Sequence, residues 1–268
     1  MKIAVNLKFV VLVLGALMQS ACLAGDGAGM APQRVELDNT APTRILFVGN
    51  SYLYYNDSIH NHVKRIAEEN GPHKTGDYQY KSATIGGARL SHHNLDSLLE
   101  PGRLGIDEPF DLVILQGGSS EPLSEDSRQA FAAKATELNE KIRKTGAEVA
   151  LYMTHAYVEP HSRFDPNMIE KIEPTYVQTG NKIDALVIPV GLAFERAYKE
   201  RPDTQLHTAF DGTHPSLLGS YLAACVVYAS VYKRPVAAIK YDYFGAVNED
   251  DARFLRRIAD ETVANFFK

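Results

Sequence analysis

The chain has 268 residues, of which 45% are hydrophobic, and it carries 28 Lys and Arg against 33 Asp and Glu, a formal net charge of −5 at pH 7. This length and composition suit a single α/β domain with a full hydrophobic core. The acidic balance argues against a nucleic-acid-binding protein, because such proteins present clustered positive charge to phosphate groups.

The first 24 residues have the layout of a secretory signal peptide. Lys2 and Lys8 precede an apolar run from Phe9 to Met18, and small residues follow as far as Ala24. The apolar run is about ten residues long, whereas a membrane-spanning helix needs about 20. We therefore expect residues 1–24 to be removed and the mature protein to be exported to the periplasm or the extracellular space.

The two cysteines have different surroundings. Cys22 ends the segment Leu17–Cys22, which resembles a degraded lipobox with Gln19 in place of the usual aliphatic residue. A lipid anchor at Cys22 and simple cleavage after Ala24 both stay open. Cys225 lies in an apolar run and predicts a buried thiol, so we expect no disulfide between the two.

The segment after the signal peptide has no sustained hydrophobic period. Residues 25–43 are rich in Gly, Ala, Pro and polar residues. Such a composition predicts a flexible spacer, because it offers no apolar face that would pack against a core. The folded domain is therefore expected to cover residues 44–268.

That domain begins with Arg44–Gly49, a short continuous apolar run that ends at a glycine. The pattern is typical of a strand that is buried on both faces of a parallel sheet. By the same criteria four more strands are predicted, over Tyr78–Ile85, Asp111–Gln116, Glu148–His155 and Ala185–Val190.

Helical patterns lie between and after these strands. The clearest predict helices over Ser58–Asn70, Ser124–Lys144, Pro215–Tyr232 and Asn248–Phe267. Strands that alternate with helices predict a three-layer α/β/α domain with a parallel five-stranded sheet. Such sheets bind ligands beyond the carboxyl ends of their strands, so the residues that directly follow each strand are candidates for a functional site.

Ser51 follows the first predicted strand in the triplet Gly49-Asn50-Ser51. A serine on a tight turn at the carboxyl edge of the sheet exposes its hydroxyl and leaves its backbone N–H free for an oxyanion. The same triplet also forms ordinary turns, so by itself it does not identify a nucleophile.

Asp211 and His214 stand three residues apart in a loop that precedes the helix beginning near Pro215. At this spacing a carboxylate can fold back onto the imidazole N–H, which selects one tautomer and stabilises the imidazolium formed during proton transfer. The alternative is that Asp211 only caps a helix and His214 lies on the surface.

A serine after the first strand and an Asp-x-x-His motif before a late helix resemble, in order and spacing, the SGNH (GDSL-like) hydrolase superfamily. The resemblance covers about residues 44–235. It implies a flavodoxin-like α/β/α fold with Ser51 as the nucleophile, His214 as the base and Asp211 as the residue that orients the histidine.

The resemblance also implies an oxyanion hole formed by the N–H of Ser51 and the N–H of Gly87, with Gly86 as an adjacent alternative. Most members carry a Gly-x-Asn-Asp motif after the third strand. This chain has Gln116-Gly117-Gly118-Ser119 there, which looks like the Gln-Gly-Glu-Ser pattern of some carbohydrate-esterase branches. The amide of Gln116 is therefore expected as the third donor.

Other residues near this edge are candidates for substrate binding. Tyr52, like Tyr54 and Tyr55, closely follows the nucleophile, and tyrosine rings stack on sugars, although they are also common on surfaces. His155 ends the fourth predicted strand and either lines the pocket or supports it. Arg89 meets an acidic substrate or only solvent.

No metal or organic cofactor is expected. The histidines at positions 60, 62, 92 and 93 lack carboxylate or thiolate partners at the spacing of a metal site. The predicted function is a serine esterase that forms an acyl-enzyme and removes acetyl or another short acyl group from a carbohydrate. Its expected partner is a small-molecule or glycan ester, with membrane contact only through an anchor at Cys22.

Two alternatives stay open. The first is a glycan O-acyltransferase, in which a sugar hydroxyl replaces water in the second step. The second is a non-catalytic glycan-binding surface protein that has kept the fold and lost the activity, which the missing asparagine of the third motif would explain. The oligomeric state is not predicted.

Overall fold

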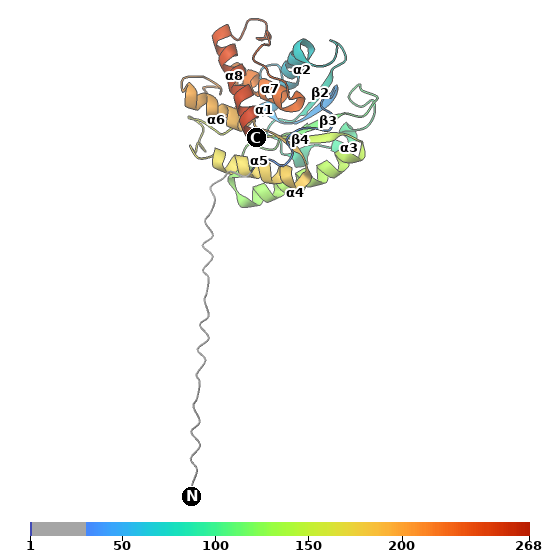
Figure 1. Ribbon diagram of the computed structural model, residues 1–268, viewed down its shortest axis with the longest axis vertical. Helices are drawn as coiled ribbons and strands as arrows, with labels where there is room; N and C mark the ends of the chain where they lie inside the picture. The colour runs from blue at the N-terminus through green and yellow to red at the C-terminus, as the bar shows by residue number, and fades with distance from the viewer. Residues whose placement is uncertain (2–30) are drawn as a thin grey trace.

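The computed structural model describes Met1 and residues 31–268. The predicted signal peptide with Cys22, and the spacer as far as residue 30, lie outside the described residues. Five strands form one sheet in the order β2-β1-β3-β4-β5, and every neighbouring pair is parallel (Figure 1). The strands are β1 (Arg44–Gly49), β2 (Gln79–Thr84), β3 (Leu112–Leu115), β4 (Glu148–Tyr152) and β5 (Leu186–Ile188).

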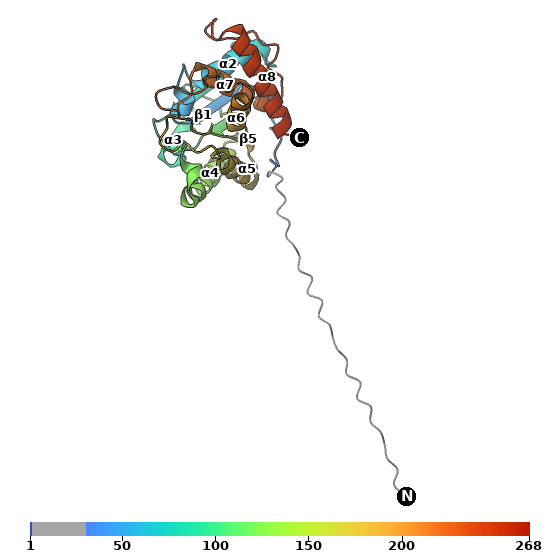
Figure 2. The same ribbon diagram turned by 90° about the vertical axis from the view of Figure 1, so that its left-hand side faces the viewer.

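Helices cover both faces of this sheet. Figure 2 shows α4 and α5 on one side, and α2, α7 and α8 on the other. The helices are α1 (Ser51–Tyr54), α2 (Ile59–Asn70), α3 (Leu95–Leu98), α4 (Glu125–Lys144), α5 (Ile169–Ile183), α6 (Val190–Glu200), α7 (Leu217–Tyr232) and α8 (Glu249–Phe266), with short 3-10 turns at Leu90–His92 and Glu121–Leu123. The predicted three-layer, flavodoxin-like α/β/α fold is confirmed.

The two core layers follow from the alternation of side chains along each strand. In β1, Ile45 and Phe47 pack into the core beneath α2, α6, α7 and α8, while Leu46 and Val48 pack into the core beneath α3, α4 and α5. All four side chains are fully buried. A strand that is apolar on both faces can be accommodated only between two helical layers, which explains the continuous apolar run in the sequence.

Helix α7 is apolar around its whole circumference, and its residues from Gly219 to Tyr232 are all buried. Such a helix needs cover on every side. The sheet covers one side, and the neighbouring helices α2, α6 and α8 cover the others. Cys225 lies within α7 as a buried free thiol, as predicted.

The predicted element boundaries differ from the observed ones by a few residues. Strand β1 has the predicted bounds, whereas the other four strands are shorter than predicted. The residue directly after β3 and the residue directly after β4 still hydrogen-bond to the neighbouring strand. The N–H of Gln116 donates to the Val48 carbonyl, and the N–H of Met153 donates to the Ile188 carbonyl. Helix α2 begins at Ile59, because Ser58 has a φ of +69°.

The expected flexible spacer is wrong for residues 31–43, because this segment is anchored to the domain. Leu37 is buried in the core. The guanidinium of Arg34 forms ion pairs with Glu148 at 2.5 Å and Asp184 at 2.8 Å, and the backbone N–H groups of Asp38 and Asn39 donate to the Glu148 carboxylate. The folded domain therefore extends at least from residue 31.

Candidate active site

Ser51 is presented by the tight turn between β1 and α1. Asn50 caps α1: its side-chain oxygen accepts the N–H of Tyr52 at 3.1 Å, and its amide donates to the Ala88 carbonyl at 2.9 Å. Ser51 is then the first residue of the helix, where backbone N–H groups have no acceptor within the helix. The turn therefore directs both the hydroxyl and the N–H of Ser51 away from the sheet edge.

The side chain of Gln116 hydrogen-bonds to this turn and does not line the cavity in front of Ser51. Its side-chain oxygen accepts the N–H of Asn50 at 2.9 Å, and its amide nitrogen donates to the carbonyl of Gly117. The residue is fully buried, and a Cβ at Gly49 would collide with its side chain. The expectation that Gln116 supplies an oxyanion donor is therefore wrong, because both ends of its carboxamide are bound to backbone groups.

The loop before α7 carries Asp211 and His214 in a fixed conformation. The N–H of Thr208 donates to the His214 carbonyl at 2.8 Å, and the N–H of Val158 donates to the Gly212 carbonyl at 2.8 Å. Gly212 has a φ of +63°, and a Cβ there would collide with the Val158 carbonyl, so only glycine fits. These bonds tie the loop to itself and to the segment that follows β4.

The structure brings Ser51, His214 and Asp211 into one chain of hydrogen bonds. The distance from His214 Nδ1 to Asp211 Oδ2 is 2.7 Å, and the distance from His214 Nε2 to Ser51 Oγ is 2.9 Å. The other oxygen of Asp211 accepts bonds from the Thr208 hydroxyl at 2.5 Å and from the N–H groups of Thr213 and His214 at 2.9 and 3.1 Å.

These bonds determine where the protons lie among Ser51, His214 and Asp211. Burial would raise the pKa of Asp211, but the hydrogen bonds from Thr208, Thr213 and His214 outweigh burial and hold this pKa well below its usual range. An ionised carboxylate only accepts hydrogen bonds, so His214 Nδ1 carries the proton. In the neutral ring Nε2 is then an acceptor, and Ser51 donates its hydroxyl proton to it.

Aromatic rings enclose the imidazole. The ring of Tyr55 stacks on His214 with centroids 4.3 Å apart and an interplanar angle of 10°, and the ring of Tyr52 meets it edge-on at 6.2 Å. The hydroxyl of Tyr52 lies 2.7 Å from Thr213 Oγ1, and only 2% of Tyr52 is exposed. Tyr52 is therefore mainly part of the wall that holds His214, while Tyr54 and Tyr55 face the opening.

His155, expected as a possible substrate-binding residue, is fully buried and does not line the cavity. Its ring is stacked between Tyr52 and Phe194 at 4.1 and 4.3 Å. Burial lowers the pKa of His155 well below the usual value, so the ring is neutral, and its Nε2 lies 2.9 Å from the Thr213 carbonyl. The structure thus corrects the expectation: His155 supports the residue that precedes His214.

A cavity of about 430 Å³ opens in front of the Ser51 hydroxyl. Its wall includes both glycines predicted after β2, Gly86 and Gly87, and Gly87 has a φ of +67° with open space where a Cβ would lie. From the β3 side the wall includes Gly118 and Ser119. The remaining lining residues are Asn50, Ser51, Tyr52, Tyr54, Tyr55, Arg89, Ser120, Tyr157, His161, Thr213 and His214.

Ser119 and Tyr157 are residues of this cavity that the sequence interpretation missed. The hydroxyl of Tyr157 donates to Ser119 Oγ at 3.0 Å, and the ring of Tyr157 lies 3.8 Å from that of His161. Ser119 was within the motif considered after the third strand, three residues beyond Gln116, so its position was a usable signal. Tyr157 follows β4 in a long loop, and nothing in the local sequence marks it.

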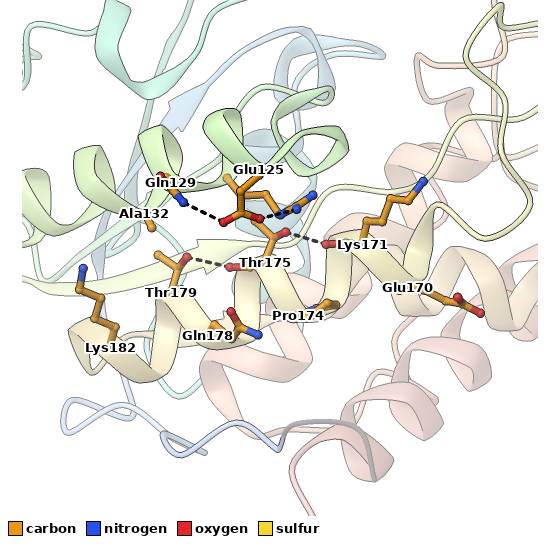
Figure 3. Close-up of a pocket in the computed structure, with 11 residues that line it drawn as sticks. Glu125, Gln129, Ala132, Glu170, Lys171, Pro174, Thr175, Gln178, Thr179 and Lys182 are labelled. Atoms are coloured by element: carbon orange, nitrogen blue, oxygen red, sulfur yellow. Dashed lines mark hydrogen bonds and ion pairs between the residues drawn. The ribbon is translucent and has the colours of Figure 1, made fainter. Parts of the chain in front are cut away.

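A larger surface groove of about 570 Å³ lies between α4 and α5 (Figure 3). Its carboxylate Glu125 binds Arg128 and Gln129, and the hydroxyls of Thr175 and Thr179 donate to carbonyls of their own helix. Among the residues that line this groove, no hydroxyl or thiol is hydrogen-bonded to a side chain that could act as its base. Within the part of the chain that the structure describes, no group of His, Cys, Asp or Glu has the arrangement of a metal site, and no helix is long and apolar enough to cross a membrane.

The fold matches several solved structures. One is a DUF4886 family protein from Bacteroides uniformis, with a TM-score of 0.64, 17% identity, and coverage of 84% of this chain and 95% of that one. Another is a proposed SGNH hydrolase from Slackia heliotrinireducens, with a TM-score of 0.57, 24% identity, and coverage of 70% and 98%. A third is the acetyl xylan esterase AlAXEase, with a TM-score of 0.55, 16% identity, and coverage of 70% and 98%.

No protein-family model and no curated protein sequence matches the chain. At identities of 24% and below, the structural matches establish the fold, which is that of the SGNH hydrolases. Function has to be argued from the site itself, because one fold supports many activities.

Proposed function

We propose that this protein is an SGNH-type serine hydrolase that cleaves esters, with Ser51 as the nucleophile. The observation that carries the proposal is the continuous hydrogen-bond chain from Asp211 through His214 to the hydroxyl of Ser51. A serine hydroxyl is a weak nucleophile by itself and needs an adjacent base that is oriented by a third group. The three residues have these relations, and Ser51 opens onto a cavity that admits a substrate.

The first step is the attack of Ser51 Oγ on the ester carbonyl carbon. His214 Nε2 takes the hydroxyl proton as the new C–O bond forms, and the imidazolium is stabilised by the ionised Asp211 carboxylate. When the tetrahedral intermediate collapses, the bond to the alcohol oxygen breaks and His214 protonates the departing alcohol. The acyl group remains on Ser51.

Three donors are proposed for the oxyanion. The N–H of Ser51 and the N–H of Gly87 come from the backbone, where they need no reorganisation during the reaction. The third is the hydroxyl of Ser119, which lines the cavity and takes the role that had been expected of the Gln116 amide. Because the Tyr157 hydroxyl donates to Ser119 Oγ, this bond does not use the proton of Ser119.

The second step repeats the first with water. His214 removes a proton from a water molecule that attacks the acyl carbon, and the proton then returns to Ser51 Oγ as the acid is released. Tyr55 covers one face of the imidazole, while the edge of the ring with Nε2 meets Ser51 Oγ. Besides substrate and water, the proposed steps use side chains and backbone groups of this chain.

A short acyl group on a carbohydrate is the proposed substrate. The cavity is small, and its lining includes the hydroxyl-bearing residues Ser119, Ser120, Tyr157 and Thr213. Such a wall suits a compact polar substrate better than a long acyl chain. The likeness to a structure named as an acetyl xylan esterase agrees with this choice. Export directed by residues 1–24 would bring the enzyme to such substrates outside the cytoplasm.

Hydrolysis of p-nitrophenyl acetate by the purified protein tests the proposal. The wild-type protein should release p-nitrophenol, and Ser51→Ala should reduce kcat/KM by about 10⁵-fold or more, because without the nucleophile little beyond binding and oxyanion stabilisation remains. Thermal unfolding of both proteins is the control that the variant is folded. Equal turnover by the two folded proteins would exclude Ser51 as the nucleophile.

A further inference from the structure

Most arginines of the described chain are neutralised by a carboxylate. Among residues 31–268, the guanidinium groups without an ion pair within 4 Å are those of Arg89, Arg103, Arg163 and Arg234. Arg234 donates instead to the Asn70 carbonyl. Two of the remaining three, Arg89 and Arg163, belong to the loops around Ser51.

Arg89 lies in the wall of the cavity together with Ser51 and Gly87. It is exposed. The charge of Arg89 acts on the carboxylate of Glu121. Glu121 is only 3% exposed and accepts the N–H of Gly118 at 2.5 Å. This buried carboxylate forms no ion pair with Arg89, so the guanidinium keeps N–H donors for a ligand. Arg89 lies between two cavities, because it also lines the neighbouring one that includes Glu121 and Glu137.

Arg163 lies on the loop after β4, which also carries the cavity-lining residues Tyr157 and His161. Its backbone N–H donates to the ring of His161 at 3.1 Å. Burial raises the pKa of the Tyr157 hydroxyl, and the charge of Arg163 partly opposes this; burial lowers the pKa of the His161 ring, and the charge of Arg163 lowers it further. A second exposed guanidinium is therefore close to the same opening.

The cavity wall contains no carboxylate, although the chain as a whole is acidic. Four other surface cavities of the described residues each include at least one Asp or Glu, such as Glu125, Glu195, Glu137 and Asp57. Asp211 is bonded to His214 behind the wall and does not line the cavity. The lining of the cavity in front of Ser51 thus includes one positively charged side chain, Arg89, and no negatively charged one.

Exposed apolar side chains gather on the same loops. Tyr54 is 41% exposed, Ile85 47%, Phe164 43% and Phe210 75%. These residues belong to the segments that follow β1, β2 and β4 and to the loop of Asp211. Rings beside an opening offer surfaces on which the apolar face of a sugar stacks. Of these four residues Tyr54 lines the cavity, and its exposed ring favours a glycan over a free small anion.

From this charge pattern we propose that the ester substrate is an acidic sugar, with a carboxylate held by Arg89 at the cavity wall and Arg163 near its rim. The inference rests on the proposed esterase function and specifies its substrate class. Arginine suits this role because its planar guanidinium binds a carboxylate through two parallel hydrogen bonds. A neutral sugar ester would lack that partner.

The test compares two substrates that differ at one carbon: an acetylated methyl glucuronoside and the corresponding acetylated methyl glucoside. The wild-type protein should have a kcat/KM at least tenfold higher for the glucuronoside, since a charge-assisted hydrogen bond contributes roughly this factor or more. The preference should shrink as salt is added. In Arg89→Gln the ratio should fall to near 1, and in Arg163→Gln it should fall by a smaller factor.

Arg103→Gln is the matched control, because Arg103 is also exposed and without an ion pair but does not line the cavity. This variant should keep the wild-type ratio. A wild-type ratio near 1, or an Arg89→Gln variant that keeps the preference, would overturn the proposal even though Ser51-dependent hydrolysis of p-nitrophenyl acetate continues.

A binding measurement separates this proposal from the esterase function. Calorimetric titration of Ser51→Ala with the acetylated glucuronoside requires no turnover. Binding at least tenfold tighter than that of the glucoside, and lost in the Ser51→Ala, Arg89→Gln double variant, supports the acidic site whether or not the protein hydrolyses esters. Equal binding of the two sugars contradicts it.

Discussion

Two polar cavities of this protein show how similar residue types differ in their capacity for chemistry. In the groove between α4 and α5, Glu125 is bound by Arg128 and Gln129, and the hydroxyl of Thr179 is bound by the carbonyl of Thr175. In the cavity of Ser51, a hydroxyl is bound by an imidazole that is itself bound by an ionised carboxylate. The groove is the larger of the two.

The difference lies in what each hydrogen bond leaves available. A threonine hydroxyl that donates to a carbonyl of its own helix has no donor left for a ligand, and the carbonyl cannot take its proton as a base would. Ser51 donates to a base that can keep the proton, and its backbone N–H stands at a helix start without an acceptor within the helix. Volume is therefore a poorer guide to a catalytic site than the direction of its hydrogen bonds.

After the loss expected for Ser51→Ala, the largest expected effect comes from Asp211→Asn. Asparagine keeps the size of the side chain but presents an amide to His214 Nδ1, so the ring adopts the other tautomer and Nε2 no longer accepts the proton of Ser51. We expect kcat for p-nitrophenyl acetate to fall by about 10⁴-fold. The measurement is steady-state hydrolysis at neutral pH.

The matched change in the groove is Glu125→Gln, which replaces a carboxylate of similar hydrogen bonding far from Ser51. It should leave kcat within about twofold of the wild-type value. If the two variants lost activity to the same extent, the contrast between the cavities would be without functional meaning.

A smaller effect is expected for Ser119→Ala, which removes the proposed third oxyanion donor. Loss of one such donor lowers kcat by about 10²-fold in well-studied hydrolases. Tyr157→Phe, which leaves Ser119 in place but removes the bond that orients it, should cost less. Burst kinetics would locate the loss in acylation. Activity unchanged in Ser119→Ala would remove this residue from the oxyanion hole.

The control for Ser119→Ala is Thr179→Val, since the hydroxyl of Thr179 bonds only within its own helix. We expect no change in kcat or KM from this variant. A loss comparable to that of Ser119→Ala would indicate a general effect on the fold rather than on the reaction.

The last prediction concerns stability near the site and no change in the reaction. His207 is 6% exposed, its Nε2 lies 3.0 Å from the Ala156 carbonyl, and burial lowers its pKa to about 4. In the unfolded chain an imidazole has a pKa of about 6.5 and binds a proton first as the pH falls. The free energy of unfolding should therefore decrease between pH 6.5 and 4, by about 3 kcal/mol from this residue.

Denaturant titrations at several pH values measure this dependence. In His207→Gln the decrease between pH 6.5 and 4 should be smaller by roughly that amount, because one proton fewer is taken up on unfolding. The same slope in both proteins would mean that His207 is not the group responsible.

The parts of the site that follow from chain order were predictable. Ser51 follows β1, and the carboxyl ends of parallel strands meet at one edge of the sheet. Asp211 and His214 lie in the loop between α6 and α7, and their spacing and position before the late helix marked them. Strand β1 was predicted with its observed bounds, because its apolar run stops at Gly49, where a side chain would collide with Gln116.

What could not be predicted depends on distances between residues remote in sequence. Gln116 and Ser119 are three residues apart after β3, and only the path of the loop decides which one faces the cavity. His155 is withdrawn from the cavity by stacking between Tyr52 and Phe194. Arg34 is anchored by Glu148, which lies 114 residues away, so no local pattern marks its segment as folded.

The most direct test of the central claim is the site of covalent labelling by an organophosphate ester such as diethyl p-nitrophenyl phosphate. Mass spectrometry of the digested protein should find a single diethylphosphoryl adduct, on Ser51, that forms far more slowly in His214→Ala. An adduct on any other residue, or equally fast labelling of Ser51 in that variant, would contradict activation of Ser51 by His214.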